Sequence, residues 1–252
     1  MKILLTNDDG YRADGIHVLA GIMKQFGDVY VVAPSEHQSG KSMAVDLGVK
    51  GIRYTDLGDG WGHLTATPAS CVKFAFNTIF ADRMPDVVVS GINHGSNAAV
   101  ASCYSGTLGA AQEAAVNFVP GIGVSLFDET LHPDFSAVER FFPDIFRKIM
   151  ALDPAGNGVY YNVNFPKLPA GSIRGVRVCT MGMCRWIREF AQDEDGSYRM
   201  SGDIEDNKVN TTRPDHRHMV DGWITIVPHR VDNTDYGEFE RMRAAGLDAD
   251  FR

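Results

Sequence analysis

The first candidate for chemistry is a pair of adjacent acids near the start of the chain. Asp8 and Asp9 follow the apolar run Ile3–Leu5, which is long enough for a buried strand, and Gly10 then breaks the backbone. Two neighbouring carboxylates at the end of a buried strand are costly to desolvate unless a positive group lies between them. Open α/β sheets bind ligands at this carboxyl end of their strands. The stretch therefore predicts a strand, an acidic turn and a candidate metal site.

Two further loops carry oxygen ligands directly after predicted strands. Ser39 follows the strand predicted at Val29–Ala33, and Asn93 and Asn97 follow the strand predicted at Asp86–Ser90. If the carboxyl ends of these strands meet at one edge of the sheet, the three loops converge on one crevice. Carboxylate, hydroxyl and amide oxygens suit Mg²⁺, Mn²⁺ or Ca²⁺ and disfavour a thiolate zinc site.

A candidate anion site follows in the sequence. Ser105, Gly106 and Thr107 stand at the start of an alanine-rich stretch that is predicted to be helical to Val116. Free backbone N–H groups at a helix N-terminus, with hydroxyls beside them, bind anions. A divalent metal next to an anion site is the layout of a phosphoester hydrolase, in which the metal polarises the phosphoryl oxygen and lowers the pKa of a water.

Each of these residues also has a purely structural interpretation. The acidic pair alone is equally consistent with a helix-capping turn, and Ser105 with a simple N-cap. Ser39 alone is typical of a loop hydroxyl, and Asn93 and Asn97 in a glycine-rich loop are typical turn formers. The functional interpretation therefore depends on their co-location.

Other candidate motifs are weaker. His94, inside the asparagine loop, is consistent with proton transfer or with a partly exposed structural role. For the stretch Asp215–His218, which contains two histidines, a solvated polar loop is favoured over a metal site. No G-x-G-x-x-G dinucleotide fingerprint follows the first strand, and no G-x-S-x-G nucleophile elbow occurs.

The elements that must position these residues form an alternating pattern. Strands and helices alternate to about residue 166, which predicts an α/β fold with a Rossmann-like, mostly parallel sheet flanked by helices. The predicted helices are Asp14–Phe26, with Asp14 as N-cap and Gly27 as stop, then Ala69–Ala81, Thr107–Val116 and Phe135–Met150. We expect one domain over 1–252, with the core at 1–166 and hairpin and C-terminal elements at 167–252.

The C-terminal part carries short strands rather than further β-α-β units. Residues 186–190 and 198–200 are predicted strands joined by the turn 193–196, and the last helix is expected near 238–247. A long hairpin that exposes Trp186 and Phe190 would be unusual on a monomer. We therefore expect this hairpin to pair with another subunit, as a β-hairpin elaboration for oligomerisation.

Composition restricts the class of protein. The 252 residues carry a formal net charge of −8, which argues against a nucleic-acid polymer or a membrane surface as partner. No window approaches the roughly 18 apolar residues of a membrane helix, and the start does not resemble a signal peptide. The four cysteines are widely spaced, as expected for reduced thiols. These features predict a cytoplasmic protein.

Several of these segments together resemble one known family. The segments MKILLTNDDG, VVAPSEHQSG, VVVSGINHGSN and YSGTLGAAQEA, in this order over residues 1–116, resemble the SurE family of stationary-phase survival proteins. TPASCVKFA and GWITIVPHRVDNT are similar to two further segments of the family. The chain departs from the family pattern at Ser70, where the family commonly has Asp, and at Ala98–Cys103, which lacks the polar and acidic residues often present there.

The resemblance implies a fold, a site and an activity. It implies a Rossmann-like sheet with an extended hairpin and an exchanged C-terminal segment, in homodimers and sometimes tetramers. It implies that one divalent ion per subunit, Mg²⁺ or Mn²⁺, is held by Asp8, Asp9, Ser39 and Asn93. It further implies that the phosphate pocket is lined by Asn97, Ser105, Gly106 and Thr107.

From the residues and the resemblance together we expect a metal-dependent 5′(3′)-nucleotidase that hydrolyses nucleoside monophosphates. Asp8 is expected mainly as a metal ligand, and Asp9 as the better candidate for taking the proton of the attacking water. Two alternatives remain. One is a phosphatase of polyphosphate or of another phosphomonoester, and the other is a non-catalytic nucleotide-binding sensor.

Overall fold

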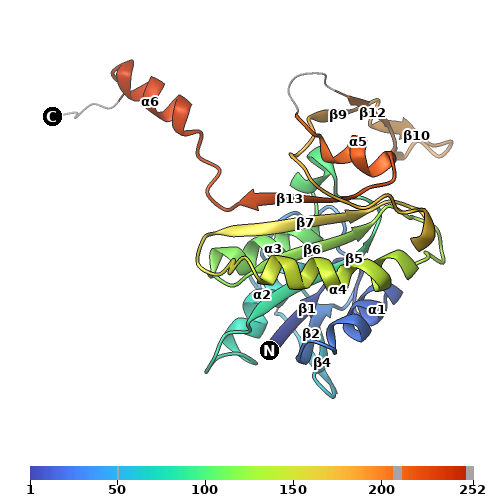
Figure 1. Cartoon of the computed structure of the whole chain (residues 1–252), viewed down its shortest axis with the longest axis vertical. Coiled ribbons are helices and arrows are strands. Elements are labelled where there is room, and N and C mark those ends of the chain that lie inside the picture. Colours follow the sequence, from blue (N-terminus) through green and yellow to red (C-terminus); the bar gives the residue numbers. More distant parts are fainter. Residues whose placement is uncertain (50, 207–211, 248–252) are drawn as a thin grey trace.

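A nine-stranded sheet forms the centre of the computed structural model, which describes residues 1–49, 51–206 and 212–247 (Figure 1). In spatial order the strands are β3 (Tyr54–Gly58), β4 (Trp61–Leu64), β2 (Asp28–Pro34), β1 (Lys2–Thr6), β5 (Val87–His94), β6 (Gly121–Leu126), β7 (Val159–Phe165), β13 (Ile224–Arg230) and β8 (Val176–Val178). The strands from β4 to β7 are parallel, β3 is antiparallel to β4, and β13 is antiparallel to β7 but parallel to β8. The predicted α/β fold with a mostly parallel sheet is confirmed.

Helices cover both faces of this sheet because its central strands are apolar on both sides. Ile3 and Leu5 pack with α1 (Asp14–Met23) and α4 (Ser136–Met150) on one face. Leu4, between them, packs on the other face with α2 (Pro68–Asn77) and α3 (Gly106–Val116). All three side chains are fully buried, and each contributes about 2 kcal/mol of hydrophobic stabilisation. The acids that follow are thereby fixed at the end of a rigid strand.

The helix boundaries differ from the sequence expectations at several ends. Asp14 is the first residue of α1 rather than its cap; Ala13 occupies the N-cap position and makes no side-chain capping bond. The helix ends at Met23, before the predicted Phe26, and α2 ends at Asn77 rather than Ala81. In contrast, the side chain of Ser105 caps α3 by accepting a hydrogen bond from the Leu108 N–H. The end of α3 that faces the candidate site is therefore sharply defined.

Two short antiparallel ribbons stand where one long hairpin was expected. β9 (Cys184–Ile187) pairs with β12 (Asp203–Asp206), and β10 (Phe190–Gln192) pairs with β11 (Tyr198–Met200) around the predicted turn. The expected single strand over 186–190 is thus interrupted. The prediction of a solvated polar loop at 215–218 is wrong. These residues belong to helix α5 (Asp215–Val220), and the Asp215 side chain is fully buried. The ribbons and α5 lie together above β13 in the view of Figure 1.

The chain leaves the sheet after β13 and ends in an isolated helix. Helix α6 (Tyr236–Ala244) lies away from the sheet and from the other helices (Figure 1). None of its residues is buried. Among the described residues, no helix is both long and apolar enough to cross a membrane.

Candidate active site

A cavity of about 390 Å³ opens at the carboxyl ends of the central strands. One group of its lining residues is polar and lies at or just after the carboxyl ends of β1, β2 and β5. A second group comes from the Ala99–Cys103 3₁₀ helix and from the two ribbons. The residues that line it are Asp8, Ser39, Gly40, Asn93, His94, Asn97, Ala101, Tyr104, Ser105, Trp186, Glu189 and Met200.

The acidic turn after β1 is held rigid by the residues on either side of the two aspartates. The side-chain amide of Asn7 donates to the Gly10 carbonyl at 2.9 Å, and the Gly10 N–H donates back to the Asn7 side chain at 3.1 Å. Gly10 has φ +97°, which side-chain-bearing residues rarely adopt. This reciprocal pair therefore fixes the direction in which Asp8 and Asp9 point.

Asp8 is buried against the first turn of α3. The Thr107 hydroxyl donates to its carboxylate at 2.5 Å, and a Cβ atom on Gly106 would lie only 2.9 Å from the Asp8 Cβ. Glycine at position 106 thus permits the close approach. Burial, and then the charge of Asp9, raise the pKa of Asp8 to about 6, against the lowering effect of the Thr107 hydroxyl and N–H. The positive end of α3 helps to stabilise this buried anion.

Asp9 lies beside Asp8 with two histidines around it. Its carboxylate accepts from the His94 backbone N–H at 3.3 Å, and the His37 ring nitrogen lies 3.5 Å from its other oxygen. Burial raises the pKa of Asp9, although the charges of His94 and His37 lower it. The His94 ring lies beside Phe135, with centroids 5.7 Å apart. His94 thus contacts Asp9 through its backbone, and its ring also packs on the core.

Asn97 is positioned by a buried amide network. Its side-chain nitrogen donates to the Ser125 hydroxyl at 2.8 Å, and its backbone N–H donates to the Asn164 side chain at 2.9 Å. Asn162 donates to the Asn97 carbonyl at 2.8 Å and accepts from the Asn164 amide. Because Ser125, Asn162 and Asn164 are fully buried on β6 and β7, the loop that carries Asn97 is attached to the centre of the sheet.

The structure brings most of the sequence-predicted residues to one place. Five of the eight line the cavity, namely Asp8, Ser39, Asn93, Asn97 and Ser105. The other three lie next to lining residues: Asp9 directly follows Asp8 and accepts from the His94 N–H, Gly106 lies against Asp8, and Thr107 is fully buried and donates to Asp8. The predicted convergence of three strand ends and one helix start therefore describes a real cavity.

The sequence did not predict four further residues of this cavity. They are Tyr104, Trp186, Glu189 and Met200, and of these only Trp186 was a candidate contact, as part of a subunit interface. The partial exposure of Trp186, at 38%, agrees with a position at a cavity mouth, while Phe190 remains 67% exposed. An exposed aromatic residue in a short ribbon was the available signal, and it is consistent with either role.

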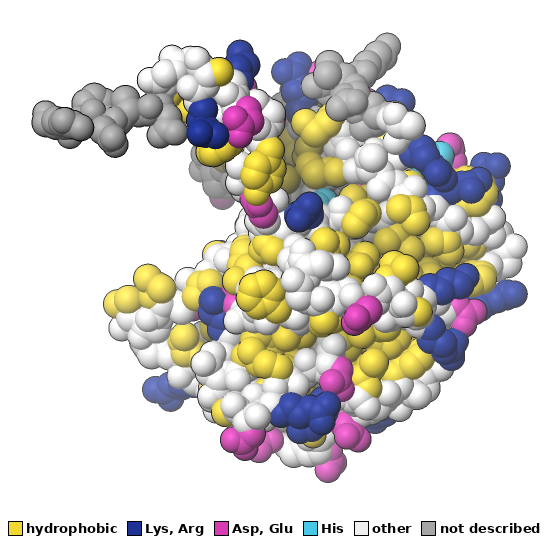
Figure 2. Space-filling model, turned by 60° about the vertical axis from the view of Figure 1, so that its left-hand side comes forward, with side chains coloured by type: hydrophobic (Ala, Val, Ile, Leu, Met, Phe, Trp, Pro, Cys, Tyr) yellow, Lys and Arg dark blue, Asp and Glu magenta, His cyan; other side chains and the backbone are white. Residues whose placement is uncertain are grey.

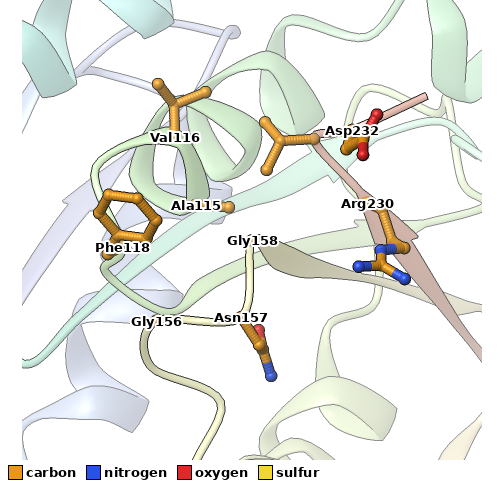
Figure 3. A pocket seen from close by; sticks show the side chains of 9 residues that line it. Ala115, Val116, Phe118, Gly156, Asn157, Gly158, Arg230 and Asp232 are labelled. Atoms are coloured by element: carbon orange, nitrogen blue, oxygen red, sulfur yellow. The ribbon is translucent and has the colours of Figure 1, made fainter. Parts of the chain in front are cut away.

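A second cavity, of about 440 Å³, lies at the other end of α3, where β7 begins and β13 ends. Figure 3 shows Phe118 on one side of it and Arg230 with Asp232 on the other. The carboxylate of Asp232 already accepts hydrogen bonds from the Tyr236 hydroxyl and the Thr234 N–H. This cavity contains none of the predicted site residues.

The donor atoms of the first cavity fit a hard divalent cation. Two adjacent carboxylates whose pKa values are raised by burial are a charge arrangement that a cation stabilises. The described residues give Asp8 no ion pair, and they contain no cluster of three or more His, Cys, Asp or Glu side chains. The available set is therefore two carboxylates with the Ser39 hydroxyl and the Asn93 amide, which are oxygen ligands of the kind that Mg²⁺ and Mn²⁺ accept.

Fold and site together define a doubly wound α/β protein with an acidic, oxygen-lined pocket at the carboxyl edge of its sheet. Residues 3–188 match the family model described as survival protein SurE. Since this match covers well over half of the 252 residues, the chain belongs to the SurE family.

Relatives of known name match nearly the whole chain. A 5′-nucleotidase SurE of Cytophaga hutchinsonii is 38% identical over 239 residues, covering 92% of each chain. One of Christiangramia forsetii is 37% identical over 241 residues, again covering 92% of each. The crystal structure of the SurE protein from Aquifex aeolicus superposes with a TM-score of 0.82 at 26% identity, over 98% of this chain and 100% of that one. The expected family and fold are thereby confirmed.

Proposed function

We propose that this chain is a metal-dependent 5′(3′)-nucleotidase that hydrolyses nucleoside monophosphates to nucleoside and phosphate. The observation that carries the proposal is the convergence of Asp8, Ser39, Asn93, Asn97 and Ser105 on one cavity. Several relatives that match almost the full chain are named 5′-nucleotidase, which supports the same activity.

Asp8, Asp9, Ser39 and Asn93 would hold one Mg²⁺ or Mn²⁺ per subunit. When bound, such a cation supplies Lewis-acid polarisation of the phosphoryl group and makes a water more acidic. Thr107 keeps Asp8 in place through its short hydrogen bond. Asn93 is oriented by donating its side-chain nitrogen to the Gly95 carbonyl at 2.8 Å.

The remaining residues of the cavity act on the substrate itself. Ser105 and the side-chain amide of Asn97 line the cavity at the α3 N-terminus, where the helix dipole favours the phosphate. Asp9, which is ten per cent exposed and next to Asp8, is the group that we assign to take the proton of the attacking water. Developing charge on the phosphoryl oxygens is stabilised by the α3 N-terminus.

The test is a phosphate-release assay on a panel of nucleoside monophosphates, polyphosphate and non-nucleotide phosphate esters. We expect turnover of the nucleotides, complete loss with EDTA, restoration by Mg²⁺ or Mn²⁺, and a strong loss in Asp9→Asn. Full activity in EDTA or in Asp9→Asn would reject the mechanism. Faster turnover of polyphosphate than of the nucleotides would make polyphosphate the substrate in place of nucleoside monophosphates. Nucleotide binding without turnover would indicate a nucleotide sensor.

We also propose that the protein is a homo-oligomer, a dimer or tetramer. Helix α6 exposes Tyr236, Phe239 and Met242, and an isolated helix of this length is marginal in water. Figure 2 shows broad hydrophobic areas on the face of the molecule beside the α6 arm. In addition, an apolar groove of about 600 Å³ lies between α4 and strands β7, β8 and β13. Both surfaces would be covered by association of copies.

A cytoplasmic location completes the proposal. All four cysteines are unpaired, and Cys71, Cys179 and Cys184 are buried. Burial raises the pKa of the Cys179 thiol to about 11, which keeps it in the unreactive protonated form. Reduced cysteines of this kind are typical of a reducing compartment.

A further inference from the structure

A buried carboxylate outside the metal-ligand set connects two separate segments of the chain that line the cavity. Asp215, on α5, is fully buried, and its carboxylate accepts from the Ala99 N–H at 2.9 Å and from the Gly182 N–H at 2.9 Å. It also accepts from the N–H of its neighbour His216 at 2.8 Å. Burying a carboxylate is costly unless hydrogen bonds compensate it, and these bonds come from three different positions of the chain.

The bond to Ala99 holds the 3₁₀ helix that borders the cavity. Ala99 is the first residue of this helix, is itself buried and has φ +53°, a left-handed conformation that alanine rarely adopts. A strained residue persists only where its surroundings fix it, and the hydrogen bond to Asp215 does so here. The same helix carries Ala101 to the cavity, and Tyr104 follows directly after it.

The bond to Gly182 holds the base of the ribbon that carries Trp186. Gly182 lies two residues before β9, and the Asp215 N–H donates to the Thr180 carbonyl at 3.0 Å. A Cβ atom at position 182 would lie 2.0 Å from a ring nitrogen of His216. The missing Cβ atom therefore lets this segment lie against α5 with the His216 ring in its present position.

We propose that Asp215 is a positioning residue that holds Ala101, Tyr104 and Trp186, the nucleoside wall, in place beside the phosphate-binding residues of the same cavity. The proposal rests on the proposed nucleotidase function. The phosphate-binding residues are polar and include Asp8 and Ser105, whereas the nucleoside wall is aromatic and apolar, as a ribose and base require. The hydrogen bonds that the Asp215 carboxylate accepts come from Ala99, Gly182 and His216, and none comes from the acids or α3 among the described residues. We therefore expect it to act on nucleoside binding and to leave the phosphate site intact.

The test separates the two groups of cavity residues. In Asp215→Asn the remaining carbonyl oxygen still accepts one of the two backbone hydrogen bonds. The new NH₂ group faces the other backbone N–H, so one of the two segments loses its attachment. We expect the KM for a nucleoside monophosphate to rise about tenfold, which corresponds to one unsatisfied buried group. The inhibition constant of inorganic phosphate should stay within about twofold of wild type, since no phosphate contact is lost.

Hydrogen exchange measures the attachment without any activity. In Asp215→Asn, amide exchange should accelerate in residues 99–104 and 180–187 together and stay unchanged in α3. Gly182→Ala, which separates the ribbon from α5 by steric contact, should give the same pattern if Asp215→Asn does not fold. Asp128→Asn, which removes another buried carboxylate with partners in Thr130 and Lys167, is the matched control and should affect neither region.

Three outcomes would overturn the assignment. These are an unchanged KM in both variants, an equal loss of nucleotide and phosphate binding, or exchange that stays slow in residues 99–104 and 180–187. A wild-type protein without nucleotidase activity would reject the proposed function alone. The exchange experiment would then still decide whether Asp215 attaches the two segments.

Discussion

At the scale of single residues, the site depends on how Asp8 is kept in place. Its carboxylate lies in the protein interior, where desolvation and the Asp9 charge raise its pKa to about 6. Thr107, 99 positions away in the sequence, opposes this by donating a hydrogen bond. The role of Thr107 is therefore to stabilise the charged form of Asp8.

Thr107→Val should weaken catalysis without unfolding the protein. The substitution keeps the shape but removes the donor, so we expect about a tenfold loss of kcat/KM. Thr225→Val is the matched control, because Thr225 is also fully buried but its hydroxyl has no hydrogen-bond partner among the described residues. Steady-state kinetics and thermal unfolding of both variants would decide. Equal activity of the two would show that the Thr107 hydrogen bond is unimportant.

At the scale of elements, helix α3 and the loop after β2 must lie in direct contact for Ser39 to reach the cavity. Gly109, on α3, makes this contact possible, since a Cβ atom there would lie 2.0 Å from the Ser42 carbonyl oxygen. The Ser42 N–H also donates to the Tyr104 carbonyl at 3.0 Å. The loop is thus fitted between α3 and the residues that precede it.

Gly109→Ala should displace this loop and lower metal affinity and activity, because a backbone atom of Ser42 blocks the added methyl group. Gly21→Ala provides the contrast within another helix. Gly21 lies on α1 with no atom within 4 Å of an added Cβ, so the protein should gain about 0.5–1 kcal/mol from better helix propensity. Chemical unfolding and Mn²⁺ titration would measure both effects. Unchanged Mn²⁺ affinity in Gly109→Ala would show that the loop does not depend on this contact.

The sequence predicted the elements that are stabilised by local residues and missed those that are stabilised by residues far away in the chain. β1 and α3 were predictable, since the run Ile3–Leu5 and the capping residue Ser105 are local signals. The convergence of the polar loops followed from the rule that parallel strands share a carboxyl edge. α5 was missed because its segment reads as polar; the bonds that bury Asp215 come from residues 33 and 116 positions away.

The nucleoside wall was beyond sequence reasoning for a related reason. Trp186 lines the cavity from a two-stranded ribbon that is separate from the main sheet, and a ribbon this short has no sequence periodicity that would predict such a position. The strand Asp203–Asp206 was missed altogether, because its acidic, exposed residues lack strand propensity. Partner residues on β9, rather than the strand's own sequence, determine its conformation.

At the scale of the whole molecule, the unpacked C-terminal helix is the feature that a single chain does not explain. We expect the double variant Phe239→Asp and Met242→Asp to shift the oligomer toward monomer, because two charges would enter an apolar contact. Leu131→Asp, at an exposed loop position, is the control and should leave assembly unchanged. Light scattering coupled to size exclusion would measure the mass. A monomeric wild type, or an oligomer that persists in the double variant, would contradict the role given to α6.

The order in which the chain supplies the two groups of cavity residues has an evolutionary consequence. The sequence-predicted polar residues of the cavity all lie within the first 107 residues, whereas Trp186, Glu189 and Met200 come from ribbons within which the SurE family match ends, at residue 188. If the nucleoside wall selects the substrate, substitutions in the ribbons would alter substrate choice while the residues that act on the phosphoester stay unchanged. Substrate choice and phosphoester chemistry can then diverge separately in this fold.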